Sequence, residues 1–407
     1  MAHNTVLGLD IGSSNIKAIV AESTKDKIKL IYGVNKPSAG IRKGAVINID
    51  EAAKAVSDVI QEIRSFYRPA IKNIFISIGD TTMKTQLSKG IVAVARASSE
   101  IGPDDINRAI QASEAINPGP NRMMLYSIPK EFTVDGLSDI KDPLGMIGSR
   151  LEVTSLIVDA FTPAVKNLKK CVEISGGSLG GLIFSPTAAA RAVLTKTQKE
   201  LGAVMIDIGF GTTGVAVYVE DKLVYSAIYP IGAGHITNDI AIALKVPVAI
   251  AEKIKIAYGY AVSKDVPSRD TIDLRKIDMN MTGSPSRRLI AEVIESRLEE
   301  IFELIDNDLK TLGLSGKLPA GAVLVGGGAK LPGVADLAKN CFKITTMIGL
   351  PHPVVFETHD QDLAECLELP DCATVLGLIL LSNDEGNIKA RPTNKGKMMR
   401  ILQNILP

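Results

Sequence analysis

The chain of 407 residues contains two similar segments, placed nearly half its length apart. In the first, an apolar run leads to Asp10, then Gly12 and small polar residues, before a second apolar run begins. In the second, an apolar run leads to Asp207 and then Gly209 in the same arrangement. Each copy predicts a β-hairpin with a glycine-rich turn. A repeat at half-chain spacing predicts two related domains that face each other.

Helical and strand patterns alternate along the rest of the chain. Residues 51–65 carry apolar side chains at three- and four-residue steps, which predicts a helix, whereas residues 74–78 predict a strand. Two long helices are expected over residues 236–260 and 287–312. This alternation predicts an α/β fold. Residues 83–160 hold several short strands and one helix, which we interpret as an inserted small α+β subdomain.

Composition excludes several classes of protein. The 46 Lys and Arg residues balance 45 Asp and Glu residues, and aromatic residues make up only 4% of the chain, without Trp. We therefore expect no nucleic-acid partner. The four cysteines form no CxxC pair and the N-terminus has no signal-peptide pattern, which favours a reducing cytosol. The longest strongly apolar stretch, residues 373–381, is too short to span a bilayer.

The two Asp-x-Gly turns predict a phosphate site. Backbone N–H groups of a Gly- and Ser-rich turn can bind an anion, and two facing turns could hold a polyphosphate from both sides. Asp10 and Asp207 would then hold a hydrated Mg²⁺, and Lys17 on the return strand could reach the phosphates. A single Asp-x-Gly is usually an ordinary turn, but two copies with matching flanks favour the phosphate interpretation. The chain contains no P-loop motif.

Two further segments suggest a nucleoside site. Gly326, Gly327 and Gly328 follow a predicted strand, and glycines let a flat base approach the backbone. The alternative is a plain strand-to-helix turn. Glu252 and Lys255 are three residues apart on a predicted helix, so they share a face and could hydrogen-bond a ribose or adenine. The alternative for this pair is a solvated ion pair.

Together these motifs resemble the actin, heat-shock-chaperone and sugar-kinase ATPase superfamily, and within it the FtsA family of bacterial cell-division proteins. The strongest likeness covers residues 234–241, 251–255, 291–297 and 323–333. The resemblance implies an α/β fold in which two actin-like (ribonuclease H-like) domains face each other across a nucleotide cleft, with an inserted small α+β subdomain. It also implies ATP and Mg²⁺ as ligands.

The resemblance implies a division of the chain into named parts. These are subdomain 1A (1–82 and 161–200), subdomain 1C (83–160), subdomain 2A (201–235 and 321–382), subdomain 2B (236–320), a flexible linker (383–396) and an amphipathic membrane-targeting helix (397–407).

The resemblance also assigns the nucleotide-binding residues. The first phosphate motif comprises Asp10, Gly12, Ser13, Ser14, Asn15 and Lys17, and the second comprises Asp207, Gly209, Gly211, Thr212 and Thr213. The adenosine motif comprises Gly326, Gly327, Gly328 and Lys330, and the nucleotide-facing helix carries Glu252, Lys255 and Gly259. The crossover stretch, residues 183–190, offers no Gln, Glu or Asp to orient a water molecule. We therefore expect ATP binding with weak or no hydrolysis, and assign no catalytic residue.

The last residues form an amphipathic pattern. On a helical wheel one side carries Met398, Met399, Ile401, Leu402, Ile405 and Leu406. Arg400 lies on the other side with Lys397, which is typical of a helix in a membrane interface. The alternative is a helix docked on the protein's own core, but the polar stretch before it favours a tether. So short a helix binds weakly alone and more strongly when a filament carries many copies.

The family resemblance implies a function. The expected protein binds ATP, polymerises, tethers the FtsZ ring to the cytoplasmic membrane and recruits later division proteins. It would receive the C-terminal peptide of FtsZ on 2B and later division proteins on 1C, contact membrane lipids, and lie at the division site on the cytoplasmic face of the membrane. In the family that peptide typically carries acidic residues. Arg287, Arg288 and Arg297, with Lys253 and Lys255, could form a basic face on 2B, and the alternative for these residues is an ordinary solvated face. The alternatives are an FtsA-like type IV pilus assembly ATPase and, less favoured, a small-molecule kinase of the same fold. A chaperone is disfavoured because no peptide-binding domain follows.

Overall fold

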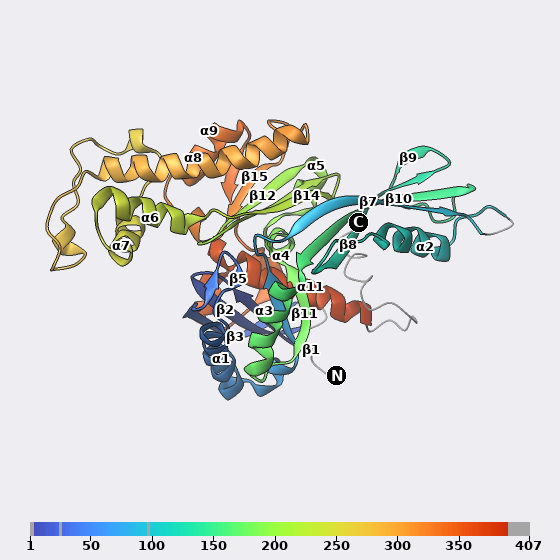
Figure 1. Cartoon of the computed structure of the whole chain (residues 1–407), viewed down its shortest axis with the longest axis horizontal. Coiled ribbons are helices and arrows are strands. Elements are labelled where there is room, and N and C mark those ends of the chain that lie inside the picture. The colour runs from blue at the N-terminus through green and yellow to red at the C-terminus, as the bar shows by residue number, and fades with distance from the viewer. Residues whose placement is uncertain (1–3, 24–26, 96–97, 390–407) are drawn as a thin grey trace.

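The computed structural model describes residues 4–23, 27–95 and 98–389. Figure 1 shows two lobes, each built around a β-sheet, and an arm of strands and one helix that projects from their junction. Within the described residues, no helix combines the length and the apolar character needed to cross a membrane. The predicted amphipathic helix at residues 397–407 lies outside the described part of the chain.

The first sheet has the strand order β11-β6-β1-β2-β3-β17. Its strands are β1 (Asn4–Ile11), β2 (Asn15–Ser23), β3 (Ile28–Pro37), β6 (Ile74–Ile78), β11 (Leu179–Phe184) and β17 (Phe356–Glu357). Helices α1 (Ile49–Phe66) and α3 (Thr162–Ile174) pack together on this sheet. Helix α1 begins after Asn48, whose side chain accepts hydrogen bonds from the backbone N–H groups of Asp50 and Glu51.

The second sheet repeats this pattern, with the order β14-β13-β12-β15-β16. Its strands are β12 (Ala203–Ile208), β13 (Thr213–Val219), β14 (Lys222–Tyr229), β15 (Gly321–Val325) and β16 (Thr346–Ile348). In the first sheet β1 pairs with β2 as a hairpin and runs parallel to β6; in the second, β12 pairs with β13 and runs parallel to β15. The predicted internal repeat of two hairpins is therefore confirmed.

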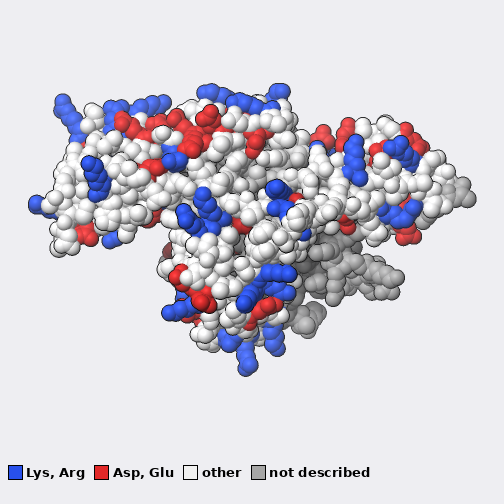
Figure 2. Space-filling view, in the orientation of Figure 1, with Lys and Arg blue, Asp and Glu red and all other residues white. Residues whose placement is uncertain are grey.

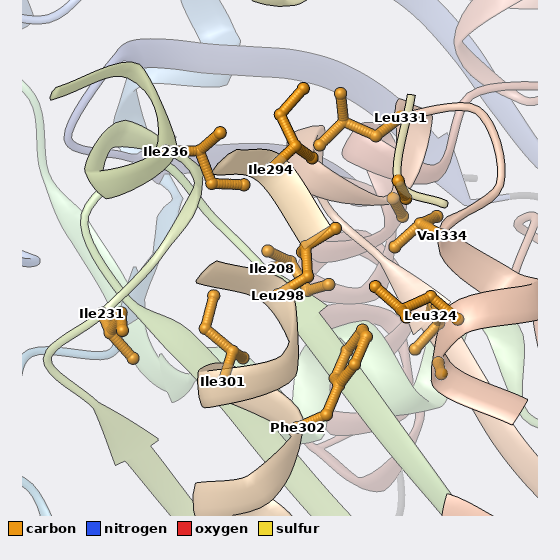
Figure 3. Packing of buried hydrophobic residues seen from close by; sticks show 14 of the residues in the cluster. Ile208, Ile231, Ile236, Ile294, Leu298, Ile301, Phe302, Leu324, Leu331 and Val334 are labelled. Atoms are coloured by element: carbon orange, nitrogen blue, oxygen red, sulfur yellow. The ribbon is translucent and has the colours of Figure 1, made fainter. Parts of the chain in front are cut away.

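Helices of the second lobe bury one face of this sheet. They are α6 (Ala233–Leu244), α7 (Val248–Tyr258), α8 (Arg287–Thr311) and α9 (Val334–Phe342). Figure 3 shows Leu298 and Phe302 of α8 directed toward Ile208 and Leu324 of the sheet. The single helix expected over residues 236–260 is wrong. The chain breaks at Lys245, which adopts the left-handed conformation, and Pro247 follows, which cannot continue a helix.

The segment expected as an inserted subdomain folds as a separate sheet, which forms the arm in Figure 1. Its elements are β7 (Lys84–Ala93), α2 (Pro103–Glu114), β8 (Arg122–Val134), β9 (Leu137–Ile140) and β10 (Arg150–Phe161), with strand order β7-β10-β8-β9. Helix α2 covers one face and buries Ala109 and Ile110 with Phe132 and Val153. At its base, the Thr85 hydroxyl donates a hydrogen bond to the backbone oxygen of Ser226 on β14 at 2.7 Å.

Two helices cross between the lobes. Helix α4 (Ser185–Val193) follows β11 of the first sheet but packs on β12 and β13 of the second, whereas α11 (Ala373–Lys389) packs on β1, β2 and β6. Subdomain 2A was expected to include residues 321–382. In the structure, however, β17 and α11 pack with the first sheet rather than with the second. Helix α11 also extends to Lys389, so residues 383–389 of the expected linker are helical.

The remaining elements are short. They are β4 (Ile41–Arg42), β5 (Ala45–Val46), α5 (Lys196–Leu201), α10 (Gln361–Cys366) and the 3₁₀ helices η1 (Arg68–Lys72), η2 (Ser263–Asp265), η3 (Leu274–Lys276), η4 (Gly327–Lys330), η5 (Pro353–Val355) and η6 (Pro370–Cys372). A disulfide joins Cys366 to Cys372 between α10 and η6, a pairing that was not expected from the sequence.

Candidate functional site

A cavity of about 570 Å³ lies between the two lobes. Most of the residues predicted to bind nucleotide line it. They are Asp10, Gly12, Ser13, Ser14, Asn15, Lys17, Asp207, Gly209, Gly211, Thr212, Glu252, Lys255, Gly326, Gly327, Gly328 and Lys330. Thr213 and Gly259 are not among the lining residues. The fold thus brings segments from both halves of the chain to one cleft.

The two hairpin turns have the same geometry. The N–H of Gly12 donates to the backbone oxygen of Asn15 at 3.0 Å, and the N–H of Gly209 donates to that of Thr212 at 2.9 Å. A Cβ atom on Gly12 would lie 2.8 Å from the Asn15 oxygen, and one on Gly209 would lie 2.9 Å from the Thr212 oxygen. Both positions therefore require glycine.

The turns also approach each other across the cleft. A Cβ atom on Gly211 of the second turn would lie 2.8 Å from the Ser13 hydroxyl oxygen of the first turn and 3.1 Å from the Lys43 nitrogen. The Ser13 hydroxyl in addition accepts a hydrogen bond from the N–H of Gly44 at 3.1 Å. Glycine at position 211 therefore lets the two phosphate-type turns meet at the same end of the cavity.

Asp10 and Asp207 are each the second-to-last residue of a strand, and both line the cavity. The Ser77 hydroxyl donates to Asp10 Oδ1 at 2.6 Å, and the Thr374 hydroxyl donates to Asp207 Oδ2 at 3.1 Å. Burial raises the pKa of Asp10, against the effects of Ser77 and Lys17. Burial, reinforced by the negative charge of Asp10, raises the pKa of Asp207 to about 6. This pair of hard oxygen ligands fits a hydrated Mg²⁺, which meets one or two carboxylates and whose charge relieves their repulsion.

Lys17 and Lys330 come from opposite lobes and share one acidic partner. Lys17 Nζ lies 2.6 Å from Asp371 Oδ2, and Lys330 Nζ lies 3.5 Å from Asp371 Oδ1. Burial by itself raises the pKa of Asp371, but the charges of the two lysines outweigh it, so this pKa is lowered. Both lysines were predicted from the sequence, whereas the acid that holds them was not.

The glycine turn after β15 packs against the second aspartate. Gly326 has a φ of 84°, and a Cβ atom there would lie 2.3 Å from Asp207 Oδ1. A Cβ atom on Gly328 would lie 2.3 Å from Ile208 Cγ2, whereas one on Gly327 would meet nothing within 4 Å. Gly326 and Gly328 are therefore required by close packing, and this turn lines the cavity as predicted.

Lys255 lies in the cleft, but its ammonium group is already engaged. Its three N–H groups donate to Glu252 Oε2 at 2.7 Å, the Thr237 hydroxyl at 2.8 Å and the Ala233 carbonyl at 3.1 Å. Burial lowers the pKa of Lys255, and Glu252 opposes this shift. Lys255 thus positions the Glu252 carboxylate at the cavity wall. The alternative of a solvated ion pair is wrong, because Lys255 is only 5% exposed.

Two predicted residues support the site from behind. Thr213 is fully buried, and its hydroxyl donates to the Ile231 carbonyl at 2.8 Å. Gly259 ends α7, where a Cβ atom would lie 2.3 Å from the Lys255 carbonyl oxygen. The cavity also has walls that were not predicted from the sequence: Asn35, Gly44, Ser77, Gly79, Phe210, Ala233, Ile256, Leu331, Pro332, Pro370, Asp371 and Thr374. Phe210, Leu331 and Pro332 lie within the segments already singled out. By contrast, Asn35, Asp371 and Thr374 come from segments that no local motif marks, and they reach the cleft through the packing of distant elements.

The outer face of the second lobe carries acidic side chains beside the basic residues that the sequence indicated. A hollow of about 450 Å³ lies between α6 and α8, and Figure 2 shows acidic side chains gathered over α8. Arg297, expected to contribute to a basic face, is paired with Asp239 at 2.6 Å and also with Glu300. Arg287 pairs with Asp270 at 3.5 Å. These pairs neutralise much of the basic charge that the sequence suggested.

Comparison with known proteins identifies the family. The family described as "Cell division protein FtsA" matches residues 204–377, and "SHS2 domain inserted in FTSA" matches residues 81–159, which corresponds to the arm. The cell-division protein FtsA of Pseudomonas aeruginosa is 33% identical over 376 residues, which are 92% of this chain and 88% of the relative. That of Borreliella burgdorferi is 33% identical over 389 residues, which are 95% and 92%.

Solved structures show the same fold at low sequence identity. The structure titled "PilM-PilN type IV pilus biogenesis complex" has a TM-score of 0.67 at 19% identity, and covers 93% of this chain and 98% of its own. MreB 5 of Spiroplasma citri bound to AMPPNP has a TM-score of 0.56 at 14% identity, with 95% and 98% covered. The predicted actin-like two-domain fold with an inserted subdomain is confirmed. Because it is 33% identical to these two cell-division proteins over 92% and 95% of its length, this chain belongs to the FtsA family of cell-division proteins.

Proposed function

We propose that this protein binds ATP, assembles into filaments and links the FtsZ ring to the cytoplasmic membrane during cell division. The observation that carries the nucleotide part is the pair of matching glycine turns, which bring Asp10 and Asp207 from two lobes to one cleft. A relative with the same fold, MreB 5 of Spiroplasma citri, was solved with AMPPNP and with ADP, which supports a nucleotide in this cleft.

Each lobe would hold part of the nucleotide. Backbone N–H groups of the two turns would bind the phosphates, Asp10 and Asp207 would hold Mg²⁺ through its water ligands, and the turn at Gly326 and Gly328 would lie against the nucleoside. Mg²⁺ would supply charge neutralisation between the carboxylates and the phosphates. Because both lobes contact one ligand, binding favours the closed arrangement of the cleft. Slow or absent hydrolysis follows from the lack of Gln, Glu or Asp in the crossover stretch.

Calorimetric titration of the full chain with Mg²⁺–ATP tests the nucleotide site. We expect binding by the wild-type protein and its loss in Gly12→Ala and in Gly209→Ala, because each added Cβ atom collides with its own turn. Melting curves of both variants check that they are folded. Wild-type protein that fails to bind Mg²⁺–ATP, or tight binding by both variants, would contradict the proposal.

The membrane link is proposed for residues 397–407. Truncation after Lys389, where α11 ends, removes the tail without cutting a described helix. We expect the truncated chain to lose co-sedimentation with vesicles that contain anionic lipid. In the full chain, Leu402→Glu on the apolar side should have the same effect, whereas Gln403→Glu on the polar side makes the same charge change and should reduce binding far less. Undiminished binding by the truncated chain would exclude this anchor.

The partner surfaces are proposed on the two outer subdomains. The C-terminal peptide of FtsZ would bind on 2B, and later division proteins would bind on 1C. Lys253 and Arg288 are the basic residues of 2B to test first, since Arg297 and Arg287 already pair with acids. Fluorescence anisotropy of a labelled FtsZ C-terminal peptide should show weaker binding to Lys253→Glu and Arg288→Glu. Equal binding by both variants would place the peptide elsewhere.

The alternatives have less support. A small-molecule kinase needs an acidic base that is available in the cleft, and Asp371, the acid newly seen there, is held by two lysines. The likeness to the PilM–PilN complex, at 19% identity, concerns the fold alone. The sequence relatives favour cell division over pilus assembly.

A further inference from the structure

Asp371 is a charged residue of the cleft that the phosphate and adenosine motifs do not include. It lies in η6, which follows the return of the chain to the first sheet at β17 and contacts η4 and β15 of the second lobe. The N–H of Gly326 donates to the Pro370 carbonyl at 3.0 Å, which fixes this segment to the glycine turn. This contact holds the backbone next to Asp371 against the second lobe.

The side chain of Asp371 connects the two lobes through lysines. Lys17 Nζ lies 2.6 Å from its carboxylate and donates a second hydrogen bond, of 2.5 Å, to its backbone oxygen. Lys330, on η4 of the other lobe, lies 3.5 Å from the second carboxylate oxygen. The Lys17 and Asp371 side chains are only 14% and 22% exposed, so water screens this pair less than a surface ion pair.

These contacts occupy a group that the nucleotide needs. An ammonium group has three N–H donors, and two of those on Lys17 are directed at Asp371. Lys17 stands opposite Asp10 in the first hairpin, at the edge of the phosphate turn. A phosphate group that binds there must compete with the Asp371 carboxylate for the same cation, and Asp371 adds a negative charge to the wall of the cleft.

We propose that Asp371 is a positioning residue that holds Lys17 until a nucleoside polyphosphate binds and then yields it to the phosphates. The residue thereby lowers the affinity for the nucleotide and eases its release. This inference rests on the proposed nucleotide function. It predicts that a phosphate group gains its contact with Lys17 only by displacing the Asp371 carboxylate, which weakens nucleotide binding.

Calorimetric titration of the full chain tests this role. Asp371→Asn keeps the size of the side chain and removes its charge, so Mg²⁺–ATP should bind about 3- to 10-fold more tightly, the range expected for loss of a partly screened competing ion pair. Adenosine, which has no phosphate, should bind with nearly unchanged affinity. The matched control is Glu368→Gln, an exposed site in the same segment with the same change of charge, and it should bind Mg²⁺–ATP like the wild type.

A double-mutant cycle separates the proposed exchange from direct repulsion. Lys17→Met should weaken Mg²⁺–ATP binding, and in that background Asp371→Asn should have an effect of less than about twofold. The inference would be overturned if Asp371→Asn tightened Mg²⁺–ATP binding as strongly in the Lys17→Met background as in the wild type. It would also be overturned if Asp371→Asn alone bound Mg²⁺–ATP no more tightly than the wild type. Either result would leave the nucleotide site itself intact. Wild-type protein that binds no nucleotide would instead overturn the proposed function. Melting curves confirm that the variants are folded.

Discussion

At the scale of single residues, the cleft is organised around two carboxylates that destabilise each other. Asp10 and Asp207 lie next to the ends of equivalent strands, and both line a partly buried cavity. Burial and the neighbouring charge raise the pKa of Asp207 to about 6. The protein thus keeps two like charges together in the absence of a cation, at a cost in stability that is typical of binding sites.

Replacing one of these charges should stabilise the unliganded protein. Near neutral pH, Asp207→Asn is expected to raise the free energy of unfolding by about 3 kcal/mol, since its pKa rises by about two on folding and each change of one corresponds to roughly 1.4 kcal/mol. Urea denaturation without nucleotide measures this, and Asp58→Asn, an exposed site on α1, is the control. A less stable Asp207→Asn would show that the carboxylate is instead satisfied by its hydrogen bond with Thr374. The same variant should lose the Mg²⁺ dependence of ATP binding.

The raised pKa of Asp207 also predicts opposite pH dependences for stability and for binding. Its pKa rises from 3.8 to about 6 on folding, so the folded chain holds more protons within this window. The contribution of Asp207 to stability is therefore present below about pH 4 and is lost as the pH rises toward 6. Mg²⁺–ATP binding needs the ionised carboxylate and should weaken as the pH falls below about 6. Titrations between pH 5 and 8 check this, and a flat profile would contradict it.

The site residues that could be predicted from the sequence are those whose role depends on residues close to them along the chain. Gly12 and Gly209 could be predicted because each closes a turn within its own hairpin. Asp371 and Thr374 could not, because they reach the cleft only after the chain returns from the second lobe and no local pattern marks them. Lys255 was located correctly, but its engagement with Thr237 on another helix depends on how α6 and α7 pack.

At the scale of elements, the two crossing helices decide how closely the lobes approach. Helices α4 and α11 each pack on the sheet of the other half, and their backbones meet at Gly377. A Cβ atom there would lie 1.8 Å from the Ala188 carbonyl oxygen. Neither helix was predicted from the sequence, and nor was this exchange, because an apolar pattern does not indicate which sheet the segment will cover.

A side chain at the crossing should therefore force the helices apart. Gly377→Ala is expected to lower the free energy of unfolding by about 2–3 kcal/mol, although alanine by itself favours a helix over glycine. Gly327→Ala serves as a comparison in urea denaturation, because a Cβ atom there meets nothing within 4 Å. An unchanged or increased stability of Gly377→Ala would mean that the two helices can separate at little cost.

At the scale of the whole molecule, one ligand is expected to join the two lobes. Residues 10–15 and 207–213 belong to different sheets, so Mg²⁺–ATP should slow hydrogen exchange in both segments together. At a ligand concentration of 100 times Kd, the free energy of unfolding should rise by about 2.7 kcal/mol. Hydrogen-exchange mass spectrometry with and without Mg²⁺–ATP measures the protection. Protection of only one of the two segments would contradict a shared ligand.

The half-chain repeat made the two-lobed architecture predictable, and the alternation of elements indicated the insertion. The break at Pro247 was missed because apolar spacing continues across it, while the proline and the left-handed Lys245 end the helix locally. The position of α11 was missed because it is set by contacts with the first sheet.

The hydrogen bond from Thr85 to Ser226 gives the projecting arm a mechanical role. It ties the root of the arm to β14, and Ile228 of the same strand packs among apolar residues of the arm and of the first lobe. Strand β14 belongs to the sheet that carries Asp207. A rotation of that sheet would therefore either break this hydrogen bond or move the arm with the sheet. Because β9 lies in the outer part of the arm, away from its attachment at β14 (Figure 1), the same rotation would displace β9 further than the root of the arm.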